Sequence, residues 1–173
     1  MKEKIKEIFD TVYPYLVIII VVVLIRSFIV TPIQVEGMSM YSTLDDKEIL
    51  LLKKYDKKFK RFDVVVFDYD GKKLIKRIIA FPGETVEYKN NKLFINDRYV
   101  KENFLDKYTK TYDFSLKDIG YTKIPKNTYF VMGDNRTNST DSRLIGPISK
   151  KQINGKTNFA LYPLNRFGNF NKA

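Results

Sequence analysis

Three separated segments of the chain combine hydroxyl, amino and carboxylate side chains, the groups from which a catalytic site without metal is built: residues 37–44, 74–84 and 133–143. The 173 residues include no histidine and no cysteine, which excludes thiol nucleophiles, Ser/His/Asp triads and nearly every zinc site. A serine hydroxyl is a poor nucleophile until a base takes its proton, and a neutral lysine amine can replace histidine as that base. The composition therefore favours serine and lysine chemistry, with no metal and no cofactor.

The segments read G-M-S-M-Y-S-T-L, L-I-K-R-I-I-A-F-P-G-E and G-D-N-R-T-N-S-T-D-S-R. In this order they resemble the motifs of the type I signal peptidases, G-x-S-M-x-P-T-L, K-R-V/I-x-x-x-P-G-D/E and G-D-N-R-x-x-S-x-D-S-R. The last motif matches at every fixed position and is highly specific. The resemblance implies that Ser39 is the nucleophile and Lys76 its general base, and that the hydroxyl of Ser139 forms a hydrogen bond with the lysine.

Lys76 must lose its charge before it can act as a base. If residues 73–80 form a strand, its side chain shares one face with Leu74 and Ile78, while Arg77 lies on the other. Apolar neighbours would desolvate the ammonium group and lower its pKa, and any repulsion from Arg77 would act in the same direction. We therefore predict a lysine that is neutral enough near pH 7 to accept a proton.

The remaining charged residues of these motifs are expected to support the site rather than react. For Arg77, an ion pair between neighbouring strands is as compatible with the sequence as a catalytic part. In the last motif we expect a charge-assisted network that fixes the loop bearing Ser139. Its predicted members are Asp134, Arg136, Asp141 and Arg143.

Two positions depart from patterns seen in this family. Ser42 stands where the family has proline, so we expect a more mobile loop that affects rate more than chemistry. Gly37 occupies a site that in some relatives supplies a hydroxyl to the oxyanion. The backbone N–H of Ser39 is therefore the one oxyanion donor that the sequence nominates.

An apolar stretch at residues 12–30 is long enough to cross a bilayer once, since a helix of this length spans about 28 Å. Lys2, Lys4 and Lys6 precede it, which predicts a cytoplasmic segment at 1–11 and an extracytoplasmic peptidase domain at 31–173. A cleavable secretory signal is the weaker alternative, because no small-x-small pair follows the apolar run.

Beyond the anchor, short runs rich in Val, Ile, Phe and Tyr alternate with Gly, Pro, Asn and Asp, which predicts a mostly β, antiparallel domain of signal-peptidase type. The segment at 102–124 is more polar and is expected to form a small inserted cap. Asn90-Asn91 and Asn96-Asp97 suit tight hairpin turns. The predicted strands are 32–36, 47–53, 62–68, 73–80, 84–88, 92–95, 98–101, 127–132 and 157–162.

The formal net charge of +11 is spread along the chain, without an arginine-rich block or a nucleic-acid motif. Beside a membrane anchor, this charge is better explained by anionic lipid headgroups than by nucleic acid. The expected partners are therefore membrane lipids and preproteins that carry signal peptides, and no prediction of oligomeric state follows.

These patterns together predict a membrane-bound serine endopeptidase that removes signal peptides from exported preproteins. One alternative is a weak or inactive relative that assists the assembly of pili or surface proteins, which the presence of Ser39 and Lys76 disfavours. Another is a self-cleaving Ser/Lys repressor, which should carry a DNA-binding domain where this chain has an apolar span.

Overall fold

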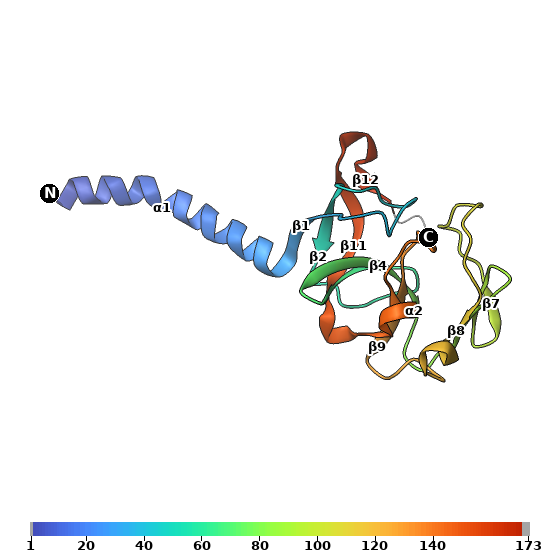
Figure 1. The fold of residues 1–173 in the computed structure, drawn as a ribbon. Coiled ribbons are helices and arrows are strands. Elements are labelled where there is room, and N and C mark those ends of the chain that lie inside the picture. The colour runs from blue at the N-terminus through green and yellow to red at the C-terminus, as the bar shows by residue number, and fades with distance from the viewer. Residues whose placement is uncertain (1, 171–173) are drawn as a thin grey trace.

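A long helix precedes the β-rich part of the chain. The computed structural model describes residues 2–170, of which α1 (Lys2–Leu24) continues into a π-helical segment, η1 (Ile25–Ile29). Figure 1 shows this helix projecting from the domain, and the stretch Phe9–Ile29 is apolar and long enough to cross a membrane, with its side chains exposed. The predicted apolar helix is confirmed, although Val30 has extended backbone angles and already belongs to the first strand.

The larger of two sheets contains eight strands in the order β1-β2-β11-β3-β4-β9-β10, with β12 paired to β11. All its pairs are antiparallel. Alternating side chains of β3 pack into separate hydrophobic clusters on the two faces, so this sheet is buried on both sides. Its strands are β1 (Val30–Gln34), β2 (Ile49–Lys53), β3 (Val64–Tyr69), β4 (Lys72–Ala80), β9 (Thr128–Met132), β10 (Ile148–Ser149), β11 (Ile153–Tyr162) and β12 (Gly168–Asn169).

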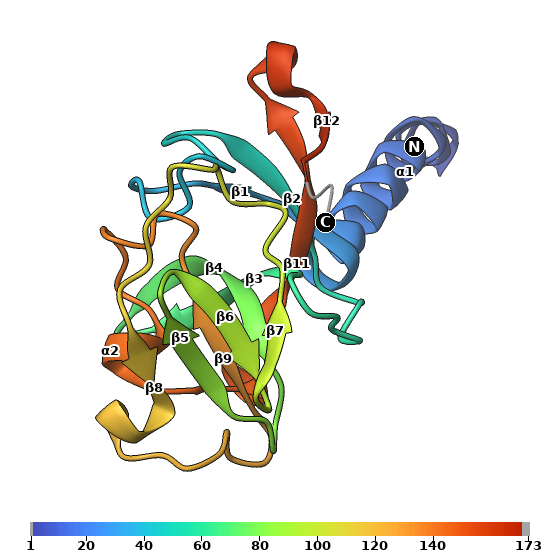
Figure 2. The same ribbon diagram turned by 90° about the vertical axis from the view of Figure 1, so that its right-hand side faces the viewer.

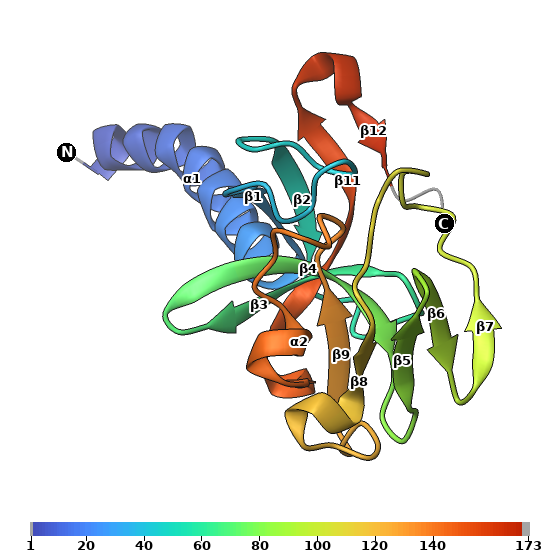
Figure 3. The same cartoon turned by 45° about the vertical axis from the view of Figure 1, so that its right-hand side comes forward.

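The second sheet has the order β7-β6-β5-β8 and lies on the side of the domain away from α1 (Figures 1 and 3). Two tight turns join three of its strands, which lie side by side in Figure 2. The turn residues Asn90, Asn91, Asn96 and Asp97 all have positive φ, between 49° and 62°, as predicted for these hairpins. Its strands are β5 (Val86–Lys89), β6 (Lys92–Ile95), β7 (Arg98–Val100) and β8 (Phe114–Ser115).

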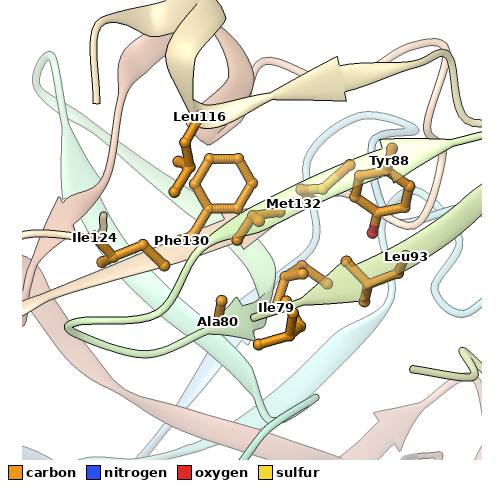
Figure 4. Close-up of a cluster of buried hydrophobic side chains, with 10 residues drawn as sticks. Ile79, Ala80, Tyr88, Leu93, Leu116, Ile124, Phe130 and Met132 are labelled. Atoms are coloured by element: carbon orange, nitrogen blue, oxygen red, sulfur yellow. The ribbon is translucent and has the colours of Figure 1, made fainter. Parts of the chain in front are cut away.

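A hydrophobic core joins the two sheets, with side chains of β4 and β9 packed against those of β5 and β6 (Figure 4). The segment at 102–124, predicted as a small inserted cap, contributes to this core. Its strand β8 pairs with β5, and Leu116 and Ile124 are buried against Phe130. The polar composition of the segment hid these contacts, because only a few of its side chains point inward.

The other helices are single turns: η2 (Leu116–Ile119), α2 (Ser142–Ile145), η3 (Lys150–Gln152) and η4 (Leu164–Arg166). The predicted strands correspond to β1 to β7, β9 and β11, with ends that differ by a few residues. Strands β8, β10 and β12 were not predicted, since two residues are too short to show an alternating pattern. The mostly antiparallel β fold with an N-terminal apolar helix is confirmed.

Candidate active site

Ser39 lies in the loop that connects β1 to β2. The side chains of Met40 and Leu44 are buried in the core beside β2 and β3, so they pin the loop to the larger sheet. Main-chain hydrogen bonds from the N–H groups of Thr43 and Leu44 to the Met40 carbonyl tighten it into a turn. Ser39 is left half-buried at the surface of this anchored turn, where a substrate can approach it.

Lys76 lies on β4 at the point where pairing with β9 ends, because Arg77 and Met132 form the last matched pair on that side. This opening lets the Ser39 loop approach the strand. The Lys76 side chain is 2 % exposed, and its Nζ lies 2.6 Å from Ser39 Oγ and 3.1 Å from the Ile75 carbonyl oxygen. The two residues that the sequence motifs nominated are therefore within hydrogen-bonding distance of each other.

Burial lowers the pKa of Lys76 from 10.5 to about 8, and the negative charges of Asp141 and Asp134 partly oppose this shift. Within residues 2–170, no carboxylate lies at ion-pair distance from Lys76. The direction agrees with the desolvation expected from the sequence. The added effect expected from Arg77 does not appear, because the charges that act on the lysine are these two carboxylates.

Arg77, the next residue on β4, is fully buried and points to the opposite face. It donates to both carboxylate oxygens of Asp134, at 2.9 and 2.6 Å, and to the carbonyl oxygen of Phe62 at 2.8 Å. Its guanidinium also reaches the hydroxyl of Thr43 at 3.4 Å and lies 4.0 Å from the centre of the Phe104 ring. These contacts give Arg77 the geometry of an ion pair that joins β4 to the loop after β9.

Asp141 organises the loop between β9 and α2. Its carboxylate accepts hydrogen bonds from the Gly133 N–H at 3.0 Å and from Arg143 Nε and a terminal nitrogen at 2.9 and 2.8 Å. It also caps α2 by accepting from the Arg143 N–H. The neighbouring Ser142 hydroxyl accepts from the Val131 N–H at 2.9 Å, which ties the loop back to β9.

Arg136 connects the same loop to the second sheet. Its terminal nitrogens donate to both oxygens of Glu102, at 2.6 and 3.2 Å, and to the hydroxyls of Tyr88 and Thr111, while Nε donates to the Gly133 carbonyl. The three partners outside the motif were missed in the sequence. A fully buried arginine requires a carboxylate, but nothing local identifies Glu102 as that carboxylate.

Ser139 lies beside the Ser39 loop, where only glycine fits at position 133. A Cβ added to Gly133 would lie 2.4 Å from the Ser39 carbonyl oxygen and within contact distance of the Ser139 side chain. The Ser139 hydroxyl is buried and has no hydrogen-bond partner in the described part of the chain. Ser139 therefore lies close to the Ser39 loop, but the predicted hydrogen bond to Lys76 is not formed within the described residues, and its lysine-orienting role stays a prediction.

The main-chain N–H groups of Gly37 and Ser39, which lie near the proposed oxyanion site, differ in their hydrogen bonding. Gly37 has a positive φ of 82°, and its N–H is used in a 2.7 Å hydrogen bond to Asp46. The Ser39 N–H, by contrast, donates no hydrogen bond to any group within residues 2–170. Ser42, which occupies the position of the family proline, is exposed.

Asn135, a residue of the last motif, holds the Ser39 loop directly and was not singled out from the sequence. Its N–H donates to the Ser39 carbonyl oxygen at 3.0 Å, and its side-chain amide donates to the Met38 carbonyl oxygen at 3.1 Å. The three motif segments therefore meet at one place, although they lie far apart along the chain.

Comparison with known proteins agrees with this convergence. Residues 8–162 match the family described as Signal peptidase, peptidase S26. Signal peptidase I S of Bacillus subtilis (strain 168) is 42 % identical over 169 residues, which cover 92 % of each chain. Signal peptidase I P of Bacillus subtilis subsp. natto is 42 % identical over 177 residues, covering 95 % of each chain.

A crystal structure of a signal peptidase I from Enterococcus faecalis V583 superimposes with a TM-score of 0.53 at 35 % identity, covering 57 % of this chain and 96 % of that one. The family match also removes the Ser/Lys repressor alternative. The fold, the meeting of the three motif segments and these relatives lead to one conclusion: the chain belongs to the type I signal peptidases of peptidase family S26, which are serine peptidases.

Proposed function

We propose that this protein removes signal peptides from exported preproteins with Ser39 as nucleophile and Lys76 as general base. The observation that supports this most strongly is the 2.6 Å separation of Lys76 Nζ and Ser39 Oγ at a site where burial lowers the lysine pKa to about 8. A buried amine with that pKa is neutral in an appreciable fraction of molecules near pH 7, and it adjoins the hydroxyl it must activate.

Each step follows from these groups. Neutral Lys76 accepts the proton of the Ser39 hydroxyl as Oγ attacks the scissile carbonyl carbon, and the Ile75 carbonyl holds an Nζ–H so that the lone pair faces Ser39. The Ser39 N–H stabilises the oxyanion. Lys76 then gives its proton to the leaving amine as the C–N bond breaks. It afterwards takes a proton from the water that attacks the acyl-enzyme, and it returns that proton to Ser39 Oγ as the ester bond breaks.

The apolar helix supports a location at the membrane. Phe9–Ile29 would anchor the chain in the bilayer, and the lysines before it favour a cytoplasmic N-terminus with the domain after residue 30 outside. The apolar part of a signal peptide would occupy the same membrane. Strand β1 forms an edge of the larger sheet and runs directly into the Ser39 loop, so an extended substrate segment can pair there.

Cleavage of a purified preprotein by the full-length chain in lipid vesicles tests the dyad. Ser39→Ala and Lys76→Ala should each reduce kcat/KM by about a hundredfold or more, because each removes one half of a unit that acts together. Lys73→Ala is the matched control, since Lys73 lies on the same strand but its side chain is 55 % exposed and binds the surface residues Asp68 and Asn154. Substantial turnover by either dyad variant would refute the mechanism.

The same assay separates the enzyme from the assembly-factor alternative. A wild-type chain that binds the preprotein without cutting it would favour an inactive relative.

The proposed topology has its own test. Protease added to intact protoplasts should digest the domain after residue 30, and complete protection of that domain would contradict the proposed orientation.

A further inference from the structure

Arg166, near the C-terminal end of the described chain, reaches back to the loop that carries Ser39. It lies at the end of η4, and one terminal nitrogen donates to the Thr43 carbonyl oxygen at 2.6 Å. The other terminal nitrogen pairs with the carboxylate of Asp45 and lies 2.9 Å from a carboxylate oxygen of Glu48. One side chain thus binds three residues of the loop between β1 and β2.

Glu48 shows that this contact is more than a surface ion pair. Its side chain is 2 % exposed, and neither of its carboxylate oxygens has a hydrogen-bond partner among the described residues. Its only ion-pair partner within residues 2–170 is Arg166. Burial raises the pKa of Glu48 and the positive charge of Arg166 opposes this rise, so the charged form of the carboxylate depends on a residue more than a hundred positions away in the chain.

Thr43 is contacted by the guanidinium groups of two arginines, one at its side chain and one at its main-chain carbonyl. Arg77 reaches the Thr43 hydroxyl at 3.4 Å while Arg166 holds the Thr43 carbonyl, so the residue is fixed by two buried or half-buried cations. The Thr43 N–H donates to the Met40 carbonyl, which places this contact in the same turn as Ser39. No proline restricts the backbone anywhere between residues 33 and 81, so the turn is held by its main-chain hydrogen bonds together with side-chain contacts such as these.

We propose that Arg166 is a positioning residue for the nucleophile: by binding Thr43, Asp45 and Glu48 it fixes the turn that holds Ser39 Oγ against Lys76. The inference rests on the proposed roles of Ser39 and Lys76. Misplacing a reacting atom by about 1 Å can cost about a hundredfold in rate, so loss of this contact is expected to reduce kcat more than it changes KM.

The experiment compares Arg166→Ala and Arg166→Lys with wild type in the vesicle cleavage assay. Arg98→Ala is the matched control, because Arg98 is an exposed arginine on β7, at the edge of the second sheet. We expect Arg166→Ala to lower kcat about tenfold or more with KM within about twofold, since the catalytic atoms remain but are less well aligned. Arg166→Lys should recover part of kcat, because an ammonium can pair with the carboxylates but cannot match the two-pronged contact.

A stability effect must be separated from positioning, because Arg166→Ala leaves the Glu48 carboxylate buried without its cation. The double variant Glu48→Gln/Arg166→Ala removes that charge while the Thr43 contact stays lost. We expect it to recover most of the loss in Tm and little of the loss in kcat. Recovery of both together would show that Arg166 only stabilises the fold and would overturn the proposal.

The outcomes also separate this inference from the proposed function. If Ser39→Ala is inactive and Arg166→Ala keeps the wild-type kcat, the dyad stands and the positioning role is wrong. If Ser39→Ala retains activity, the dyad fails, and the positioning role fails with it.

Discussion

Lys76 and Arg77 are adjacent on one strand and both are buried basic residues, but they differ in whether a carboxylate binds them. Arg77 is held by both oxygens of Asp134, whereas Lys76 faces the Ser39 hydroxyl and a main-chain carbonyl. A buried cation paired with a carboxylate keeps its charge, while a buried amine without one loses its proton more easily. The alternation of the strand thus places a structural cation and the proposed proton acceptor on opposite faces, one residue apart.

The comparison of Lys76 with Arg77 shows that burial alone does not turn a basic side chain into a proton acceptor. The carboxylates of Asp141 and Asp134 both act on Lys76, but each is held by an arginine, Arg143 and Arg77 respectively. They oppose the desolvation of the lysine only partly. The acidic residues near the site are therefore bound to other cations, which leaves the amine available.

The largest effect on cleavage is expected when Lys76 is replaced by arginine, so that both faces of β4 carry a guanidinium at this point. Lys76→Arg should lower kcat/KM by about a hundredfold or more, because a guanidinium stays protonated and cannot accept the serine proton. Preprotein cleavage measures this loss, and a circular dichroism spectrum like that of wild type shows that the fold is kept. An active Lys76→Arg enzyme would mean that position 76 does not act as the base.

Removing the structural cation should affect stability instead. Arg77→Ala leaves Asp134 buried and unpaired, which is expected to lower the free energy of unfolding by about 3–5 kcal/mol. Arg77→Lys should lose less, because it keeps the charge without the two-pronged hydrogen bonds. Urea unfolding of the detergent-solubilised protein measures both values, and a loss below about 1 kcal/mol for Arg77→Ala would contradict a structural role.

Changing the charge of Asp141 should move the pH dependence of cleavage. The carboxylate raises the pKa of Lys76, so Asp141→Asn should lower it and shift the acid limb of kcat/KM to lower pH. Arg143→Gln removes the neighbouring cation and keeps the carboxylate, so it should not shift the limb in that direction. Profiles that move together in the two variants would show a loss of structure rather than a charge effect.

The smallest effect is expected for Ser139→Ala, at a severalfold loss of kcat. The hydroxyl is predicted to orient the lysine, which makes it an aid to the base and not the base itself. In the described structure this hydroxyl has no hydrogen-bond partner, and Lys76 Nζ binds Ser39 Oγ and the Ile75 carbonyl instead, so only a modest loss is expected. Unchanged kcat and pH profile in this variant would remove Ser139 from the site.

Much of the fold was predictable because it depends on local patterns. The apolar run predicted the long N-terminal helix, alternation predicted most strands, and paired Asn and Asp residues predicted the two hairpins. The helix begins at Lys2, well before the apolar run, because Lys and Glu are good helix formers even where they are polar. Only patterns that span several residues were recognised, so the two-residue strands were not.

The ionic contacts that hold the site together were not predictable. Arg136 and Glu102 are 34 residues apart, and Arg166 and Asp45 are 121 apart. Neither pairing leaves a periodic signal, since each depends on how two distant loops meet. The motifs identified Ser39 and Lys76 because the family resemblance supplied what spacing alone does not.

The pH dependence of kcat/KM for the wild-type enzyme tests the central claim most directly. The neutral fraction of Lys76 increases as the pH rises through its pKa, so the rate should rise on an acid limb with a midpoint of about 8, where burial places this pKa. An acid limb near 10.4, the value for an unperturbed lysine, would contradict activation of Lys76 by burial.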